Sequence, residues 1–119
     1  MKLTETVQSG DWKNEKHVPE LEVKKLEDNK YEITAVVGKE ITHPNTLEHH
    51  IAWIKVFFIP EGAKLPIEIA NYNFSAHGET DVFTEPVAKG VLKTETKGML
   101  YALSYCNIHG LWEGSLELA

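Results

Sequence analysis

The sequence has little cysteine, because Cys106 is the only one among its 119 residues. A single thiol excludes an internal disulfide, so a reducing cytoplasm is the expected setting. The chain also lacks an apolar run long enough to span a bilayer, and its first residues, MKLTE, carry no apolar signal segment. We therefore expect a cytoplasmic protein that does not bind membranes.

Positive charge is scarce as well, since 12 Lys and Arg stand against 18 Asp and Glu, for a formal net charge of −6. Nucleic-acid binding requires clustered Lys and Arg, so no nucleic-acid partner is expected. The length is typical of one domain, here residues 1–119, and the hydrophobic content of 42% is that of an ordinary globular chain. The six histidines are the unusual feature of the composition.

Long helical patterns are missing too. Short segments of alternating apolar and polar residues, separated by turn residues, predict an all-β sandwich. Residues 1–18 are expected to be irregular, and residues 76–79 to form a connection. The predicted strands are an edge strand at 20–27, a strand at 30–37, a central strand at 52–59, and further strands at 67–74, 87–93, 99–105 and 114–118.

The stretch YCNIHG at residues 105–110 carries the clearest chemical signal. It places the thiol of Cys106 three residues before the imidazole of His109, in a turn closed by Gly110. Thiolate and imidazole both bind iron, zinc and copper. Two ligands do not fill a metal site, so further ligands must come from elsewhere in the chain.

Histidines on loops or strand edges beside Pro or Gly are the candidates. Because loops gather at the ends of a sandwich, these side chains could meet Cys106 at one end. Of the adjacent His49 and His50, one should face inward and the other outward. His77 is expected to be solvated or to stabilise a turn. The candidate set is therefore His17, His43, His49 and His109.

Three hypotheses remain open for this set of residues, and an iron centre is the first. Structural zinc usually takes more thiolate, whereas mostly imidazole ligands with one thiolate suit an iron centre with an open position. A thiolate opposite that position would push electron density toward whatever binds there. A blue-copper site is the second hypothesis, but it expects a Met soon after the His, and the chain has only Met1 and Met99. A non-catalytic sandwich module is the third. Tyr105, Trp112 and Trp53 are expected in the core or in a pocket wall.

Three motifs, in order along the chain, resemble those of superoxide reductases of the one-iron, neelaredoxin-like type, which are related to the catalytic domain of desulfoferrodoxin. They are EKHVP at 15–19, HPNT at 43–46 with EHHI at 48–51, and SYCNIHGLW at 104–112. The similarity extends to AHGE at 76–79 and TEP at 84–86. The stretch 78–83 is shorter than in many members, a departure that touches no ligand position.

The resemblance implies an immunoglobulin-like β-sandwich of about seven strands that holds one iron per chain. Cys106 would be the axial ligand, Glu15 would occupy the sixth position in the ferric state, and Lys16 would lie on a mobile loop near the open position. His50 and His77 do not fall on ligand positions. The equatorial ligands implied are His17, His43, His49 and His109.

The activity implied is the one-electron reduction of superoxide to hydrogen peroxide, without release of O₂, at an iron that cycles between Fe(II) and Fe(III). Glu15 and Lys16 would be the catalytic residues around the iron. Rubredoxin or a similar small electron-transfer protein would be the donor. The resemblance also implies a homo-oligomer, a dimer or a tetramer.

Overall fold

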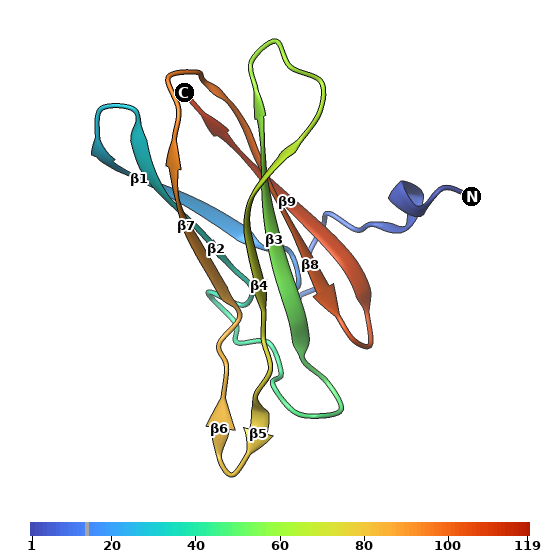
Figure 1. Ribbon diagram of the computed structural model, residues 1–119. Helices are drawn as coiled ribbons and strands as arrows, with labels where there is room; N and C mark the ends of the chain where they lie inside the picture. The colour runs from blue at the N-terminus through green and yellow to red at the C-terminus, as the bar shows by residue number, and fades with distance from the viewer. Residues whose placement is uncertain (14) are drawn as a thin grey trace.

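The computed structural model describes residues 1–13 and 15–119, and strands dominate it (Figure 1). Seven long strands build the body and two short ones form a separate hairpin. The short element η1 (Leu3–Thr6) is a 3₁₀ turn in the segment expected to be irregular. The strands are β1 (Glu20–Glu27), β2 (Lys30–Val36), β3 (Ile51–Pro60), β4 (Ile67–Asn73), β5 (His77–Glu79), β6 (Val82–Phe83), β7 (Val87–Lys93), β8 (Gly98–Cys106) and β9 (Gly110–Leu118).

The long strands form two antiparallel sheets that pack as a sandwich. One sheet has the order β1-β2-β7 and the other β4-β3-β8-β9, while β5 and β6 pair with each other. One sheet holds the first, second and fifth of the long strands, and the other holds the third, fourth, sixth and seventh. This differs from the seven-strand immunoglobulin constant type only in the sheet to which the fourth strand belongs. The expected all-β sandwich of about seven strands is therefore confirmed.

The core lies between the two sheets because alternate residues of each strand point inward. Ile54, Val56 and Phe58 of β3 are buried, whereas their neighbours along the strand are half-exposed. Leu100 and Ala102 continue this layer on β8. From the opposite sheet, the buried residues are Ile33, Ala35 and Ala88. Because every second residue of these strands is buried, apolar and polar residues alternate along the sequence, and this alternation allowed the strands to be predicted.

Two predicted boundaries were wrong. The last strand starts at Gly110 rather than at 114, because Cys106 and Gly110 already pair across the β8–β9 turn. Gly110 has a φ of +84°, a conformation that side-chain-bearing residues rarely adopt, and this closes the turn within three residues. The connection expected at 76–79 instead begins the β5–β6 hairpin.

The strand register brings distant loops to one end of the sandwich, the lower end in Figure 1. Ile51 at the start of β3 pairs with Cys106 at the end of β8, so the loop before β3 lies beside the β8–β9 turn. The β5–β6 hairpin projects from the same end. Among the described residues, no helix is long and apolar enough to cross a membrane.

The segment that leads into β1 crosses very close to β9. Gly114 permits this approach, because a Cβ atom built there would lie 2.2 Å from the carbonyl oxygen of Pro19. Pro19 itself is fully buried. The crossing fixes the position of residue 17, two positions earlier, at the same end of the sandwich.

Candidate metal centre

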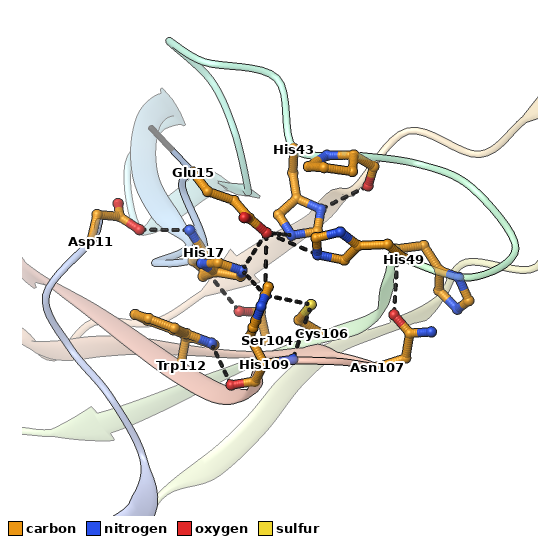
Figure 2. Close-up of polar contacts among 12 residues, drawn as sticks. Asp11, Glu15, His17, His43, His49, Ser104, Cys106, Asn107, His109 and Trp112 are labelled. Atoms are coloured by element: carbon orange, nitrogen blue, oxygen red, sulfur yellow. Dashed lines mark hydrogen bonds and ion pairs between the residues drawn. The ribbon is translucent and has the colours of Figure 1, made fainter. Parts of the chain in front are cut away.

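Four histidine side chains from three separate segments converge on one carboxylate oxygen, Oε1 of Glu15 (Figure 2). The distances to this oxygen are 3.1 Å from Nε2 of His17, 3.4 Å from Nε2 of His43, 2.8 Å from Nε2 of His49 and 3.2 Å from Nδ1 of His109. Four nitrogen atoms therefore surround a single point.

The four imidazole rings form a closed square. Each ring meets the next edge to face, with centroids 4.8–5.0 Å apart and planes inclined by 71–83°. The order around the square is His17, His43, His49, His109 and back to His17. Rings in this arrangement aim one nitrogen each at the interior and do not stack on one another.

The sulfur of Cys106 belongs to the same cluster. It groups with His17, His43 and His49, and the Glu15 carboxylate groups with His17, His49 and His109; within each group all candidate ligand atoms lie within 4.8 Å of one another. Cys106 is fully buried. The cluster thus offers four imidazole nitrogens, one sulfur and one carboxylate oxygen.

His43 is fixed in the form that can bind a metal. Its Nδ1 lies 2.7 Å from the backbone carbonyl oxygen of Pro44. A carbonyl can only accept, so Nδ1 carries the proton and Nε2 presents its lone pair to the cluster. Burial lowers the pKa of His43 to about 4, which keeps the ring neutral at physiological pH. The hydrogen bond to Pro44 is the kind of outer contact that orients metal-bound imidazoles.

His17 is held from several directions. The Oδ1 atom of Asp11 accepts the backbone N–H groups of His17 and Val18, at 2.5 and 2.9 Å. Ser104 donates its hydroxyl to the carbonyl of His17 at 2.8 Å, and Trp112 stacks on the ring at 4.4 Å and 12°. Burial lowers the pKa of His17 as well. Its Nδ1 is buried and has no hydrogen-bond partner among residues 1–13 and 15–119.

The β8–β9 turn wraps around the sulfur. The backbone N–H of His109 donates to Sγ of Cys106 at 3.4 Å. Burial raises the pKa of the Cys106 thiol, and the N–H groups of His109 and Ile108 oppose that shift. A metal that binds here must therefore displace the thiol proton. Trp112 donates its indole N–H to the carbonyl of His109 at 3.2 Å and ties the turn to β9.

One side chain joins this turn to the loop that carries His49. Nδ2 of Asn107 donates to the carbonyl of Glu48 at 3.0 Å, and Oδ1 of Asn107 accepts the backbone N–H of His50 at 2.9 Å. The amide therefore brackets His49 on both sides. Its position between two candidate ligands, Cys106 and His109, couples two segments that lie more than fifty residues apart in the sequence.

The ligand side chains of the cluster differ in their exposure to solvent. The side chains of His17 and His43 are fully buried, whereas those of Glu15, His49 and His109 are 20–25% exposed. The thiol lies on the protected side and the carboxylate on the open side. A small molecule would therefore approach past Glu15.

The side chains fit a metal ion better than they fit one another. Oε1 of Glu15 and the Nε2 atoms of His43 and His49 are buried, and within the described part of the chain they have no hydrogen-bond partner. Neighbouring ligands at right angles around an ion with bonds of about 2.1 Å lie about 3 Å apart. The spacings of 2.8–3.4 Å around Oε1 match that value. Imidazole and thiolate donors together are typical of iron, zinc or copper.

Comparison with known proteins gives this donor set a context. The sequence profile described as desulfoferrodoxin matches residues 9–115. The superoxide reductase of Pyrococcus furiosus is 52% identical, covering 98% of each chain, and the neelaredoxin of Megalodesulfovibrio gigas is 45% identical, covering 100% of this chain and 98% of that protein. A crystal structure of superoxide reductase in the oxidized state has a TM-score of 0.95 at 51% identity, covering 99% of this chain and 100% of that one.

The chain belongs to the desulfoferrodoxin family. The resemblance stated from the three motifs is thereby confirmed. The blue-copper alternative finds no support in these relatives. Its methionine is also missing from the cluster, because Met99 lies at the far end of β8 from Cys106 and Met1 is fully exposed.

The two histidines that the sequence left outside the ligand set also lie outside the cluster of this desulfoferrodoxin-family chain. His49 faces inward and His50 faces away, as the alternation predicted, and His50 stacks on His77. His77 was expected to be solvated or to stabilise a turn. Solvation was wrong, since the residue is 8% exposed, but its side chain does form hydrogen bonds, to Asn45 and to the carbonyl oxygen of Phe74. Trp112 is buried beside the cluster, whereas Trp53 and Tyr105 stack on each other, half-exposed.

Lys16 lies between Glu15 and His17 and is half-exposed. No ion pair involves it within the described residues. The sequence analysis missed Asp11, Asn107 and Trp12, the last of which lies edge-on to His17 and His109 at 5.0 and 4.7 Å. A carboxylate in the Gly10-Asp11 turn was the available signal for Asp11. Turn residues of this kind are common, so the signal was weak.

Proposed function

We propose that this chain is a superoxide reductase, which reduces superoxide with one electron and two protons to hydrogen peroxide. The observation that carries the proposal is the convergence of four imidazole nitrogens around Oε1 of Glu15, with the Cys106 sulfur alongside. The relatives named above as superoxide reductases support the same reaction. We further propose that the metal is one iron per chain.

The residues that would hold the iron are His17, His43, His49, His109 and Cys106, with Glu15 as an additional ligand in the oxidised protein. When bound, iron supplies one-electron chemistry by cycling between Fe(II) and Fe(III). The buried side of the cluster keeps Cys106 away from solvent, which protects the thiolate from oxidation. A diatomic anion would approach from the partly exposed side, where the Glu15 carboxylate lies.

Glu15 controls access to the open side. Its carboxylate lies over the nitrogens in the structure, within 2.8 Å of His49. A superoxide anion needs that place, and the negative carboxylate would repel it. Glu15 must therefore swing outward before the substrate binds, and its return would close the site after peroxide leaves.

Lys16 supplies the opposite charge. The net charge of −6 disfavours an anion at long range, but charges act mainly within about 8 Å at physiological salt. An ammonium beside the open side can therefore attract superoxide locally. Lys16 would also orient a water molecule that delivers one of the two protons needed to release hydrogen peroxide.

The electron must come from another protein, and we propose rubredoxin or a similar small donor. The half-exposed edges of His49 and His109 and the exposed side chain of Ile108 offer a place for it to approach. Such redox encounters are usually small and transient. By resemblance to the family, we also propose a cytoplasmic homo-oligomer.

The test is to expose the reduced, iron-loaded protein to a pulse of superoxide and to measure the products. We expect one hydrogen peroxide for each superoxide consumed, one oxidised iron and no O₂. Cys106→Ser should abolish the visible thiolate-to-metal absorption and the activity, because a hydroxyl is a poor donor. Release of O₂ from every second superoxide would instead identify a dismutase and contradict the proposal.

A further inference from the structure

His77 is buried outside the metal cluster, yet both of its ring nitrogens are engaged. Its Nδ1 lies 2.7 Å from Oδ1 of Asn45, and its Nε2 lies 2.8 Å from the carbonyl oxygen of Phe74. One face of the ring stacks on His50, with centroids 3.6 Å apart and planes within 9°. No part of the proposed reaction uses these contacts.

The orientation of the Asn45 amide decides which atoms carry protons. Nδ2 of Asn45 donates to the backbone carbonyl of Thr84 at 3.0 Å. Because a carbonyl can only accept, the NH₂ group must face Thr84, and the amide oxygen must face His77. The carbonyl of Phe74 is likewise only an acceptor. Both ring nitrogens of His77 therefore have to donate, which requires a doubly protonated imidazolium.

The groups that face His77 are compatible with a positive charge. Oε1 of Glu79 accepts the backbone N–H of His77 at 2.7 Å, which places a carboxylate next to the main chain of that residue. His50 places Nδ1 2.8 Å from the carbonyl oxygen of Thr46, which can only accept, so that nitrogen carries a proton. Backbone N–H donation from His77 is the main reason why the pKa of Glu79 lies below its usual value.

These contacts lie on the loop that holds half of the imidazole square. Asn45 follows His43 by two residues, and His50 directly follows His49. The hairpin that carries His77 is itself anchored, because Thr84 and Ala76 exchange hydrogen bonds of 2.8 and 3.0 Å. His77 thus contacts the loop at two points: it bonds to Asn45 near the start of the loop and stacks on His50 at the end of the loop.

We propose that His77 is a positioning residue, held as an imidazolium, that fixes the loop bearing His43 and His49 in its metal-binding form. This inference rests on the proposed function, since it assigns a role toward the same metal site. The charge strengthens the hydrogen bond to Asn45. Outer contacts of this kind typically change metal affinity 10- to 100-fold.

The protonation state is tested directly by NMR of the ring nitrogens in the full-length, zinc-loaded protein, in which zinc serves as a diamagnetic probe. We expect both ring nitrogens of His77 to carry protons at pH 7.5, because each faces an oxygen that can only accept. A single protonated nitrogen at that pH would overturn the imidazolium assignment.

The positioning role is tested by metal release. His77→Gln keeps an amide donor for Phe74 but loses the donor facing Asn45, whereas His77→Asn can restore the latter. We expect zinc transfer to a chelator to be about tenfold faster than wild type in His77→Gln and within about threefold in His77→Asn. Glu79→Gln, which keeps an acceptor for the N–H, is the matched control and should behave as wild type.

Equal release rates in all variants would overturn the inference and leave the proposed function intact, because zinc transfer does not depend on superoxide chemistry. If His77→Gln unfolds, the His77→Asn variant and the NMR result still decide the matter. Failure of the wild-type protein to bind zinc or iron would overturn both proposals together.

Discussion

The molecule contains two groups of histidines that differ in how their nitrogens are satisfied. In the square, neighbouring rings meet edge to face, and the nitrogens aimed at the interior surround Glu15. In the outer pair, His50 and His77 stack face to face, and both nitrogens of His77 have hydrogen-bond partners. In the square, the Nε2 atoms of His43 and His49 have no hydrogen-bond partner among the described residues, and a metal would satisfy them. Both nitrogens of His77 are satisfied without one.

This difference shows why a count of histidines is a poor guide to a metal site. Both groups lie at the same end of the sandwich, and each contains buried rings, those of His17 and His43 in the square and that of His77 in the outer pair. What separates them is the direction of the nitrogen lone pairs. Convergence of nitrogens without hydrogen-bond partners indicates metal binding, and saturation by carbonyl and amide oxygens indicates a structural role.

The proposed difference between the two histidine groups is tested most sharply by removing one ring from each group. His43→Ala should weaken iron or zinc binding by more than about 100-fold, beyond the range for outer contacts. His50→Ala should weaken it far less, since no nitrogen of His50 faces the square. Metal titration of both variants measures the contrast. Equal losses would mean that the two groups are not functionally distinct.

Acid should destabilise the metal-free square. Burial lowers the pKa of His43 from 6.5 to about 4 in the folded state, so below pH 6.5 the unfolded chain binds more protons than the folded one. Stability is therefore fully present above pH 6.5 and falls as the pH drops to 4. The loss from His43 should be about 3 kcal/mol.

Urea unfolding of the metal-free protein between pH 7 and 4 measures this loss. His43→Phe should remove that part of the pH dependence, because phenylalanine does not titrate. A free energy of unfolding that is flat over this range in the wild type would contradict the burial of a neutral His43.

The placement of His17 depends on the close crossing at Gly114. In Gly114→Ala, the added Cβ would lie 2.2 Å from the carbonyl oxygen of Pro19, so the backbone must shift. We expect a loss of about 2 kcal/mol in the free energy of unfolding, together with weaker metal binding. Gly10→Ala is the control, since nothing lies within 4 Å of its Cβ. Thermal unfolding of both variants measures the difference, and the midpoint temperature should fall in Gly114→Ala but not in Gly10→Ala.

The smallest expected effect concerns Lys16. Lys16→Ala should slow the second-order reaction with superoxide roughly tenfold at low salt and reduce its dependence on ionic strength. Lys97→Ala removes the same charge at the far end of β8 and should leave the rate nearly unchanged. Pulse radiolysis of the two variants measures the difference. Identical rates would show that net charge matters more than position.

The sequence predicted the sandwich because its strands are long and half-buried, which produces clear alternation in β2, β3 and β8. The β5–β6 hairpin was not predictable in this way, since strands of three and two residues are too short to show a period. The start of β9 was missed because Gly110 closes a tight turn at once.

The candidate site was predictable to a different extent. The four histidines and Cys106 were placed in one set because the histidines lie on loops or strand edges beside Pro or Gly, and because the motifs resemble those of superoxide reductases. The structure brings these side chains together. The roles of Asp11 and Asn107 depend on which backbone groups their side chains reach across the fold. Contacts between side chains and distant backbone groups cannot be predicted from positions in the sequence alone. Polar residues in turns are also too common for these two to be singled out. The burial of His77 was missed for the same reason.

The most direct test of the central claim is X-ray absorption spectroscopy at the iron edge of the iron-loaded protein. Our account predicts a single sulfur neighbour, from Cys106, and at least four nitrogen or oxygen neighbours with the multiple-scattering signature of imidazole. A spectrum without a sulfur neighbour, or one without imidazole scattering, would contradict the convergence of these side chains on one metal.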